Sequence, residues 1–221
     1  MNTSGSIGGS LEDDGWAIVS TIASTQEGIA AEMKLLASTL GEIAPGRGGR
    51  PVEPILPESV ETARVGSLSS KYGLRPLPLH TDTAHWNVPC RYLLLACVDP
   101  GPVPTPTILL DSRSIQLSDS ERLACRSAPF VVRNGRFSFY GTIMDRDRPF
   151  IRLDPGCMKA LSNDGADALA AFSLERHAKS LLRHDWKHGN VLLFDNWRLL
   201  HARGYDTLTE PGRVLLRIMI R

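Results

Sequence analysis

The stretch 188–203, HGNVLLFDNWRLLHAR, contains two short apolar segments separated by a polar turn. Residues 191–194 are apolar, Asp195 and Asn196 interrupt them, and a second apolar segment leads to His201. Short apolar runs bounded by turn-forming residues are typical of buried strands. The pattern therefore predicts two strands and places His201 on a strand rather than in a loop.

Similar strand-like segments recur along the rest of the chain, at 15–22, 91–98, 106–111, 130–139 and 213–221. Within 130–139, Asn134-Gly135 stands between two apolar arms and predicts a hairpin. One amphipathic helix is expected over 25–40, opened by Thr25, and another over 166–183. Many short strands with Pro/Gly turns and one or two covering helices predict a jelly-roll or a barrel.

The composition is that of a soluble globular protein. The 221 residues carry a net charge of +1, with 42% hydrophobic and 22% charged residues, which gives no sign of nucleic-acid or membrane partners. Residues 1–14 are rich in Gly and Ser and predict a flexible leader before a single domain over 15–221. There is no signal-like region and no long apolar run, and the four scattered cysteines predict buried, reduced thiols in a cytoplasmic protein.

The histidines differ in their potential as metal ligands. His80 and Asp82 are two residues apart, so on a strand both side chains would point to the same side. His85 breaks this alternation and is expected at the rim or against substrate instead. The remaining three histidines are expected to be structural (His177, His184 and His188).

His201 would complete a set of two imidazoles and one carboxylate with His80 and Asp82. This set leaves three positions of a metal open and is typical of non-haem Fe(II) oxygenases. The ligands alone do not exclude a non-catalytic cupin-like binding module. A zinc hydrolase would additionally need a carboxylate base, which is not evident on the ligand-bearing strands.

The chain resembles the taurine dioxygenase-like (clavaminate synthase-like) family of Fe(II)/2-oxoglutarate-dependent oxygenases. Four features match in order: HTD at 80–82, TPTILLD at 105–111, DNWRLLHAR at 195–203 and RVLLR at 213–217. The resemblance implies a mostly β protein with flanking helices (α+β) and a double-stranded β-helix (jelly-roll, cupin-like) core. It also implies a dioxygenase that uses O₂ and 2-oxoglutarate and releases succinate and CO₂. Hydroxylation of an unactivated C–H bond would be the usual outcome.

The same resemblance assigns roles to individual residues. His80, Asp82 and His201 would hold Fe(II), while Arg213 and Thr107 would bind the far carboxylate of 2-oxoglutarate, which a planar guanidinium fork suits well. Alternation along the last strand puts Arg217 on the same side as Arg213. Arg217 would grip an acidic group of a small anionic or amino-acid-like substrate.

Two alternatives for Arg217 stay open: an ion pair with a residue such as Asp111 or Asp195, or a second contact to 2-oxoglutarate. Asn190 stands where the family usually has Asp, and the stretch between Thr107 and His201 is shorter than usual. A smaller lid leaves room for a bulky or carrier-tethered substrate, or for a second subunit that completes the pocket, so a homo-oligomer is also left open.

Overall fold

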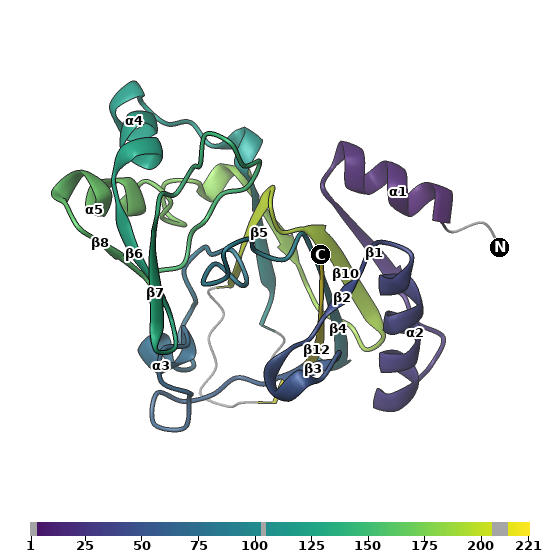
Figure 1. Cartoon of the computed structure of the whole chain (residues 1–221). Coiled ribbons are helices and arrows are strands. Elements are labelled where there is room, and N and C mark those ends of the chain that lie inside the picture. The colour runs from purple at the N-terminus through teal and green to yellow at the C-terminus, as the bar shows by residue number, and fades with distance from the viewer. Residues whose placement is uncertain (1–3, 103–104, 205–211) are drawn as a thin grey trace.

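The computed structural model describes residues 4–102, 105–204 and 212–221. Within them the chain is mostly β, with a few helices around the sheets (Figure 1). The largest sheet has six strands in the order β1-β10-β4-β12-β2, and β3 also pairs with β12. These strands are β1 (Trp16–Ser20), β2 (Ile43–Ala44), β3 (Glu53–Ile55), β4 (Tyr92–Asp99), β10 (Asn190–Asp195) and β12 (Val214–Ile220).

Two smaller sheets have three strands each, in the orders β11-β5-β9 and β7-β6-β8. Their strands are β5 (Thr107–Asp111), β6 (Phe130–Asn134), β7 (Phe137–Gly141), β8 (Met158–Ala160), β9 (Leu181–His184) and β11 (Leu199–Arg203). The α-helices are α1 (Ser4–Asp13), α2 (Gln26–Ser38), α3 (Ser69–Tyr72), α4 (Asp119–Ser127) and α5 (Asn163–Ala170).

Alternation along the strands of the large sheet separates two hydrophobic layers. On β10, Leu193 packs in the layer that includes Ile29 and Met33 of α2. Its neighbours Leu192 and Phe194 point the other way, into a layer that includes Leu109 of β5. Because successive side chains of a strand point to opposite sides, one sheet can be covered by helices on one side and by another sheet on the other.

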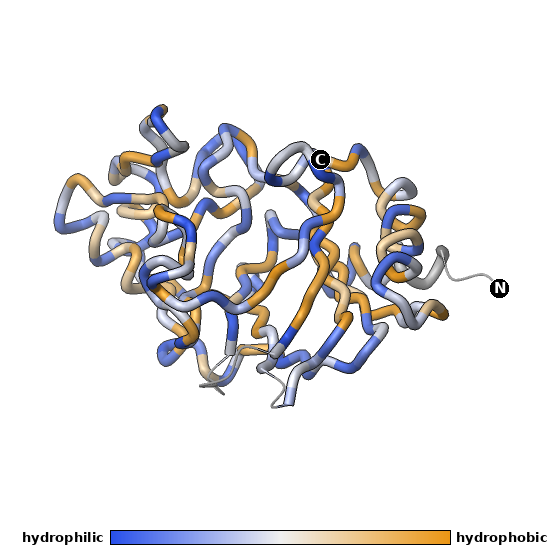
Figure 2. The backbone as a smooth tube through the Cα atoms, turned by 90° about the horizontal axis from the view of Figure 1, so that it is seen from below, coloured by the Kyte–Doolittle hydropathy of each residue, from blue (hydrophilic) through white to orange (hydrophobic). Residues whose placement is uncertain are grey.

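Strand β5 of the β11-β5-β9 sheet is also buried on both sides. Leu109 faces the large sheet, whereas Ile108 and Leu110 pack into a third layer with residues of α4, α5 and β6, such as Cys125 and Phe130. Figure 1 shows α1 and α2 beside the large sheet, and α4 and α5 beside β6 and β8 on the far side of β5. In Figure 2, hydrophobic residues follow the strands while hydrophilic residues gather in the connections.

Helix α2 confirms the first helix expected from the sequence. The Thr25 hydroxyl accepts a hydrogen bond from the Gly28 N–H at 3.2 Å and caps the first turn. Ile29, Met33 and Ala37 are buried at helical spacing, which explains why the apolar stripe identified this segment.

The second expected helix, over 166–183, is wrong beyond Ala170. Helix α5 ends there, and the His177 ring contacts the Ala171 carbonyl oxygen at 2.9 Å, while Leu181–His184 pairs with β5 as β9. Pairing with a distant strand overrides the helical spacing of the apolar residues.

Two further details differ from the expectations. Residues 4–13 form α1 where a leader was expected, and Leu11 packs against the helix-covered side of the large sheet. The predicted hairpin exists, but Asn134 pairs with Phe137, so the two turn residues are Gly135 and Arg136. Gly135 has φ +60°, a conformation that glycine adopts without steric cost.

The four cysteines are free and buried, as expected. Across the described parts of the chain, no helix is both long enough and apolar enough to cross a membrane.

Candidate active site

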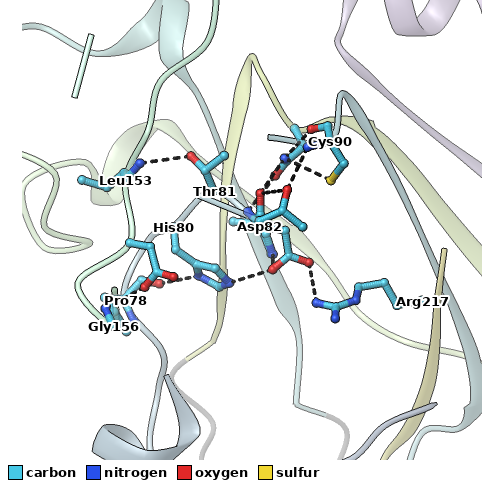
Figure 3. A network of polar contacts seen from close by, with 12 residues as sticks. Pro78, His80, Thr81, Asp82, Cys90, Leu153, Gly156 and Arg217 are labelled. Atoms are coloured by element: carbon cyan, nitrogen blue, oxygen red, sulfur yellow. Dashed lines mark hydrogen bonds and ion pairs between the residues drawn. The ribbon is translucent and has the colours of Figure 1, made fainter. Parts of the chain in front are cut away.

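Three potential metal ligands converge between the large sheet and β11. The backbones of His80 and His201 exchange two hydrogen bonds, at 2.9 and 3.0 Å, which fixes the two rings side by side. The Asp82 Oδ1 atom lies 3.8 Å from His80 Nε2 and 3.9 Å from His201 Nε2 (Figure 3). One ligand atom from each residue lies within 4.8 Å of the others, so the three could hold one metal ion.

Hydrogen bonding and burial prepare the two rings for ligation. His80 Nδ1 lies 2.9 Å from the Pro78 carbonyl oxygen, an acceptor, so Nδ1 donates a hydrogen bond and Nε2 is the ring nitrogen turned toward Asp82 (Figure 3). Burial, together with the neighbouring His80, lowers the pKa of His201 to about 3. His201 is therefore a neutral imidazole, the form that binds metals.

The backbone of Asp82 is held by Asn196, at the end of β10. Asn196 Oδ1 accepts a hydrogen bond from the Asp82 N–H at 2.9 Å, and its Nδ2 donates to the Asp82 and Cys90 carbonyl oxygens. Thr83 follows with φ 56°, the only positive value at a described residue other than glycine. Asp82 thus begins a turn rather than continuing a strand. Its side chain converges with His80 as expected, but because of this turn and not because of strand alternation.

Arg217 of β12 binds two carboxylates at once. Its Nη1 donates to Asp82 Oδ2 at 2.7 Å and its Nη2 to Glu53 Oε2 at 2.6 Å. Burial opposes ionisation of both acids, but Arg217 outweighs it and holds the pKa of Asp82 and of Glu53 below the usual range. The distal oxygen of Asp82 is therefore occupied, while Oδ1 faces the two histidines.

The ion-pair partners considered for Arg217 from the sequence were wrong. Asp111 pairs with Arg198 at 2.6 Å, and Asp195 lies 3.9 Å from Arg91. Both acids lie at the ends of their strands, whereas Arg217 lies across from Glu53 in the register of β3 and β12.

Another arginine, Arg213, lies just before β12 and is buried. Its Nη1 donates to the Thr105 carbonyl oxygen at 2.7 Å, and its Nε has no partner among the described residues. Burial, with the nearby Arg203, lowers its pKa to about 10, so the guanidinium stays charged near neutral pH. No described carboxylate forms an ion pair with it.

Thr107, the first residue of β5, lies across from Arg203 of β11. Its hydroxyl oxygen accepts a hydrogen bond from Trp186 Nε1 at 3.1 Å, which leaves the hydroxyl proton available to another acceptor. Arg203 donates to the carbonyl oxygens of Gly73 and Arg75. This end of the site is therefore rich in donors and positive charge.

The other histidines lie outside the ligand cluster. His85 is half-buried beside Trp86, with ring centroids 6.2 Å apart, and is not one of the three clustered residues. The rings of His177 and His188 contact backbone carbonyl oxygens, and His184 packs edge-on against Trp186.

Glu53, Asn196 and Trp186 had no assigned role before the structure was known. Asn196 follows Asp195 in the polar turn between two apolar segments, and a polar residue at that place was the only sequence signal of its role. Glu53 lies 164 residues from Arg217 in a strand of three residues, so no local pattern connects them.

The chain matches the family "Taurine catabolism dioxygenase TauD, TfdA family" over residues 11–219. It belongs to this family, which confirms the resemblance and the expectation of an Fe(II)- and 2-oxoglutarate-dependent dioxygenase, an oxidoreductase. No curated protein sequence matches the chain.

Several solved structures share the fold. An asparagine oxygenase in complex with Fe(II), 2S,3S-3-hydroxyasparagine and succinate has a TM-score of 0.76 at 19% identity, covering 97% of this chain and 77% of that one. The oxygenase OrfP, in complex with Fe, succinate and (3S)-hydroxy-L-Arg, has a TM-score of 0.70 at 20% identity. The match covers 96% of this chain and 76% of OrfP. PvcB of Pseudomonas aeruginosa has a TM-score of 0.71 at 17% identity, and the match covers 100% of this chain and 80% of PvcB.

Proposed function

We propose that this chain holds Fe(II) with His80, Asp82 and His201 and oxidises an unactivated C–H bond of a small, amino-acid-like substrate. In the simplest outcome, hydroxylation, the substrate, 2-oxoglutarate and O₂ become the hydroxylated product, succinate and CO₂. The observation that carries this proposal is the convergence of the three ligand atoms within 4.8 Å, with the Arg217 guanidinium bound to Asp82.

The three side chains fit an Fe(II) ion by their chemistry. Two imidazoles and one ionised carboxylate leave open positions for a cosubstrate and O₂, as in the 2-His-1-carboxylate sites of non-haem oxygenases. Iron, when bound, supplies the activation of O₂ that oxidation of such a bond requires. The protein keeps Asp82 ionised through Arg217 and orients His80 through the Pro78 carbonyl oxygen.

Arg213 and Thr107 are proposed to bind the far carboxylate of 2-oxoglutarate. Arg213 is a buried cation with an unpartnered Nε, and a carboxylate would supply the missing charge and acceptor. The Thr107 hydroxyl, already oriented by Trp186, has its proton free to donate. The second end of the cosubstrate would then face the ligand cluster.

Arg217 is proposed to contact an acidic group of the substrate. A guanidinium has five N–H donors, and the bonds to Asp82 and Glu53 use one from each terminal nitrogen. Its Nε has no partner among the described residues. Structures of similar fold contain hydroxylated asparagine or arginine, which supports a substrate with an α-carboxylate.

We also propose that the two facing sheets form the double-stranded β-helix core implied by the family, in a single domain over 15–221. The hydrophobic layer shared by β4, β10, β12 and β5 supports this arrangement.

The alternative functions have weaker support. A zinc hydrolase needs a free carboxylate base, and both oxygens of Glu53, the carboxylate added to the site by the structure, already accept hydrogen bonds from Arg217 and from the Arg47 N–H. A purely binding cupin-like module would not need a complete set of iron ligands together with a buried arginine, Arg213, that pairs with no described carboxylate.

Anaerobic iron analysis combined with a succinate-release assay tests the proposal. Asp82→Ala and His201→Ala should lose iron and abolish turnover, whereas His85→Ala should keep its iron. A panel of amino acids, including asparagine and arginine, together with taurine should then reveal the substrate by stimulated succinate formation. Iron loss from His85→Ala, with turnover intact in Asp82→Ala, would reject the ligand assignment.

A further inference from the structure

Glu53 occupies a place prepared for it by the chain around it. It is 5% exposed, and its Oε1 accepts a hydrogen bond from the Arg47 N–H while Oε2 binds Arg217. A Cβ on Gly46 would lie 2.4 Å from the carboxyl carbon of Glu53, closer than two such atoms can approach. Glycine at position 46 therefore makes room for this carboxylate.

The position of Glu53 determines how Arg217 can meet Asp82. Alone with a carboxylate, an arginine favours a two-pronged pair in which both carboxylate oxygens accept hydrogen bonds. Here Glu53 takes Nη2, and only Nη1 reaches Asp82, through Oδ2. Oδ1 is thereby left to face His80 and His201.

We propose that Glu53 is a positioning residue for the metal site: by sharing Arg217, it keeps one oxygen of Asp82 free for the metal ion. This inference rests on the proposed iron site. Without Glu53, the guanidinium would turn its full charge and both terminal nitrogens toward Asp82 and compete with the metal. Substitution of a residue that orients a metal ligand in this way typically lowers metal affinity by about 10–100-fold.

The experiment is an anaerobic titration of the metal-free full-length chain with Fe(II), and with Co(II) as a spectroscopic probe of the ligand set. Glu53→Gln should raise the metal dissociation constant by about tenfold or more and alter the Co(II) absorption spectrum. Gly46→Ala, which keeps both charges but displaces the carboxylate, should shift the constant in the same direction. Glu42→Gln, on an exposed acid beside Arg221 at the edge of the same sheet, is the matched control and should bind like the wild type.

The double variant Glu53→Gln with Arg217→Ala separates positioning from a general loss of structure. Because the competing guanidinium is gone, metal affinity should return toward that of the wild type. The proposal is overturned if Glu53→Gln binds metal like Glu42→Gln, or if the double variant stays as weak as Glu53→Gln. Failure of the wild type itself to bind either metal would instead reject the iron site.

Discussion

Two arginines of the last segment, Arg213 just before β12 and Arg217 within it, are held in opposite ways. Arg217 is neutralised by the protein, through Asp82 and Glu53, whereas Arg213 contacts a backbone carbonyl oxygen and pairs with no described carboxylate. A buried cation is stable only when its charge and donors are satisfied. We infer from this contrast that Arg217 orients Asp82 and offers its remaining donors to the substrate, while Arg213 serves the far carboxylate of 2-oxoglutarate.

The largest effect is expected at Arg217. Arg217→Ala should abolish substrate-stimulated turnover, because it removes the proposed contact to the substrate, yet leave 2-oxoglutarate binding intact. The measurement is succinate release, together with the metal-to-ligand absorption band of the anaerobic Fe(II)–2-oxoglutarate complex. Loss of that band with the substitution would mean that Arg217 serves the cosubstrate or the fold, and the contrast with Arg213 would disappear.

A complementary effect is expected at Arg213. Arg213→Ala should raise the apparent constant for 2-oxoglutarate at least tenfold, since a desolvated carboxylate without its charge partner costs on the order of 2–5 kcal/mol. Arg176→Ala removes an arginine from an exposed pair with Glu121 and is the matched control. A constant close to that of the control would identify another arginine, such as Arg203, as the clamp.

Acid pH should lower the stability of the metal-free protein through His201. The pKa of His201 is about 3, below its usual value of about 6.5, so the unfolded chain binds a proton that the folded chain excludes. This stability is present above about pH 6.5 and is lost as the pH falls toward 3. His201 alone should reduce the free energy of unfolding by about 2 kcal/mol between about pH 7 and about pH 5.

Urea unfolding of the metal-free protein at both pH values measures this loss. His201→Asn should flatten the pH dependence by about the same amount, because asparagine does not titrate. Arg213, with a pKa of about 10, stays charged at both pH values and does not contribute to the pH dependence of the free energy of unfolding. An equally steep loss in His201→Asn would assign the effect to other groups.

The smallest effect is expected at Thr107. Thr107→Val removes one hydroxyl donor from the proposed 2-oxoglutarate site, worth about 1 kcal/mol, so the apparent constant should rise about fivefold. Trp186→Phe removes the N–H that orients this hydroxyl, together with part of the buried ring, and should have a smaller effect on the constant in the same direction. A greater loss in Trp186→Phe than in Thr107→Val would show that the indole acts independently of the hydroxyl.

Local sequence patterns predicted most of the strands and singled out the three side chains that the structure brings together. The continuous apolar run of β10 reflects burial on both sides of the strand, and the helical spacing in α2 reflects burial on one side of the helix. Both patterns are properties of consecutive residues. His80, Asp82 and His201 were identified as a set because their types and order are distinctive, although Asp82 lies in a turn rather than on a strand.

The features that the sequence did not predict depend on contacts between segments that are far apart in the chain. Glu53 reaches Arg217 only because β3 pairs with β12, and β9 replaces the end of an expected helix because it pairs with β5. Short strands such as β3, with three residues around a proline, carry too little periodicity to be recognised in isolation.

The anaerobic absorption spectrum of the Fe(II)-loaded chain, recorded as 2-oxoglutarate is added, tests most directly whether His80, Asp82 and His201 form an iron site served by Arg213. We expect a metal-to-ligand band that saturates in the wild type and in His85→Ala. The band should require much more 2-oxoglutarate in Arg213→Ala and be absent in Asp82→Ala. A band of wild-type strength in Asp82→Ala, or none in the wild type, would contradict the assignment.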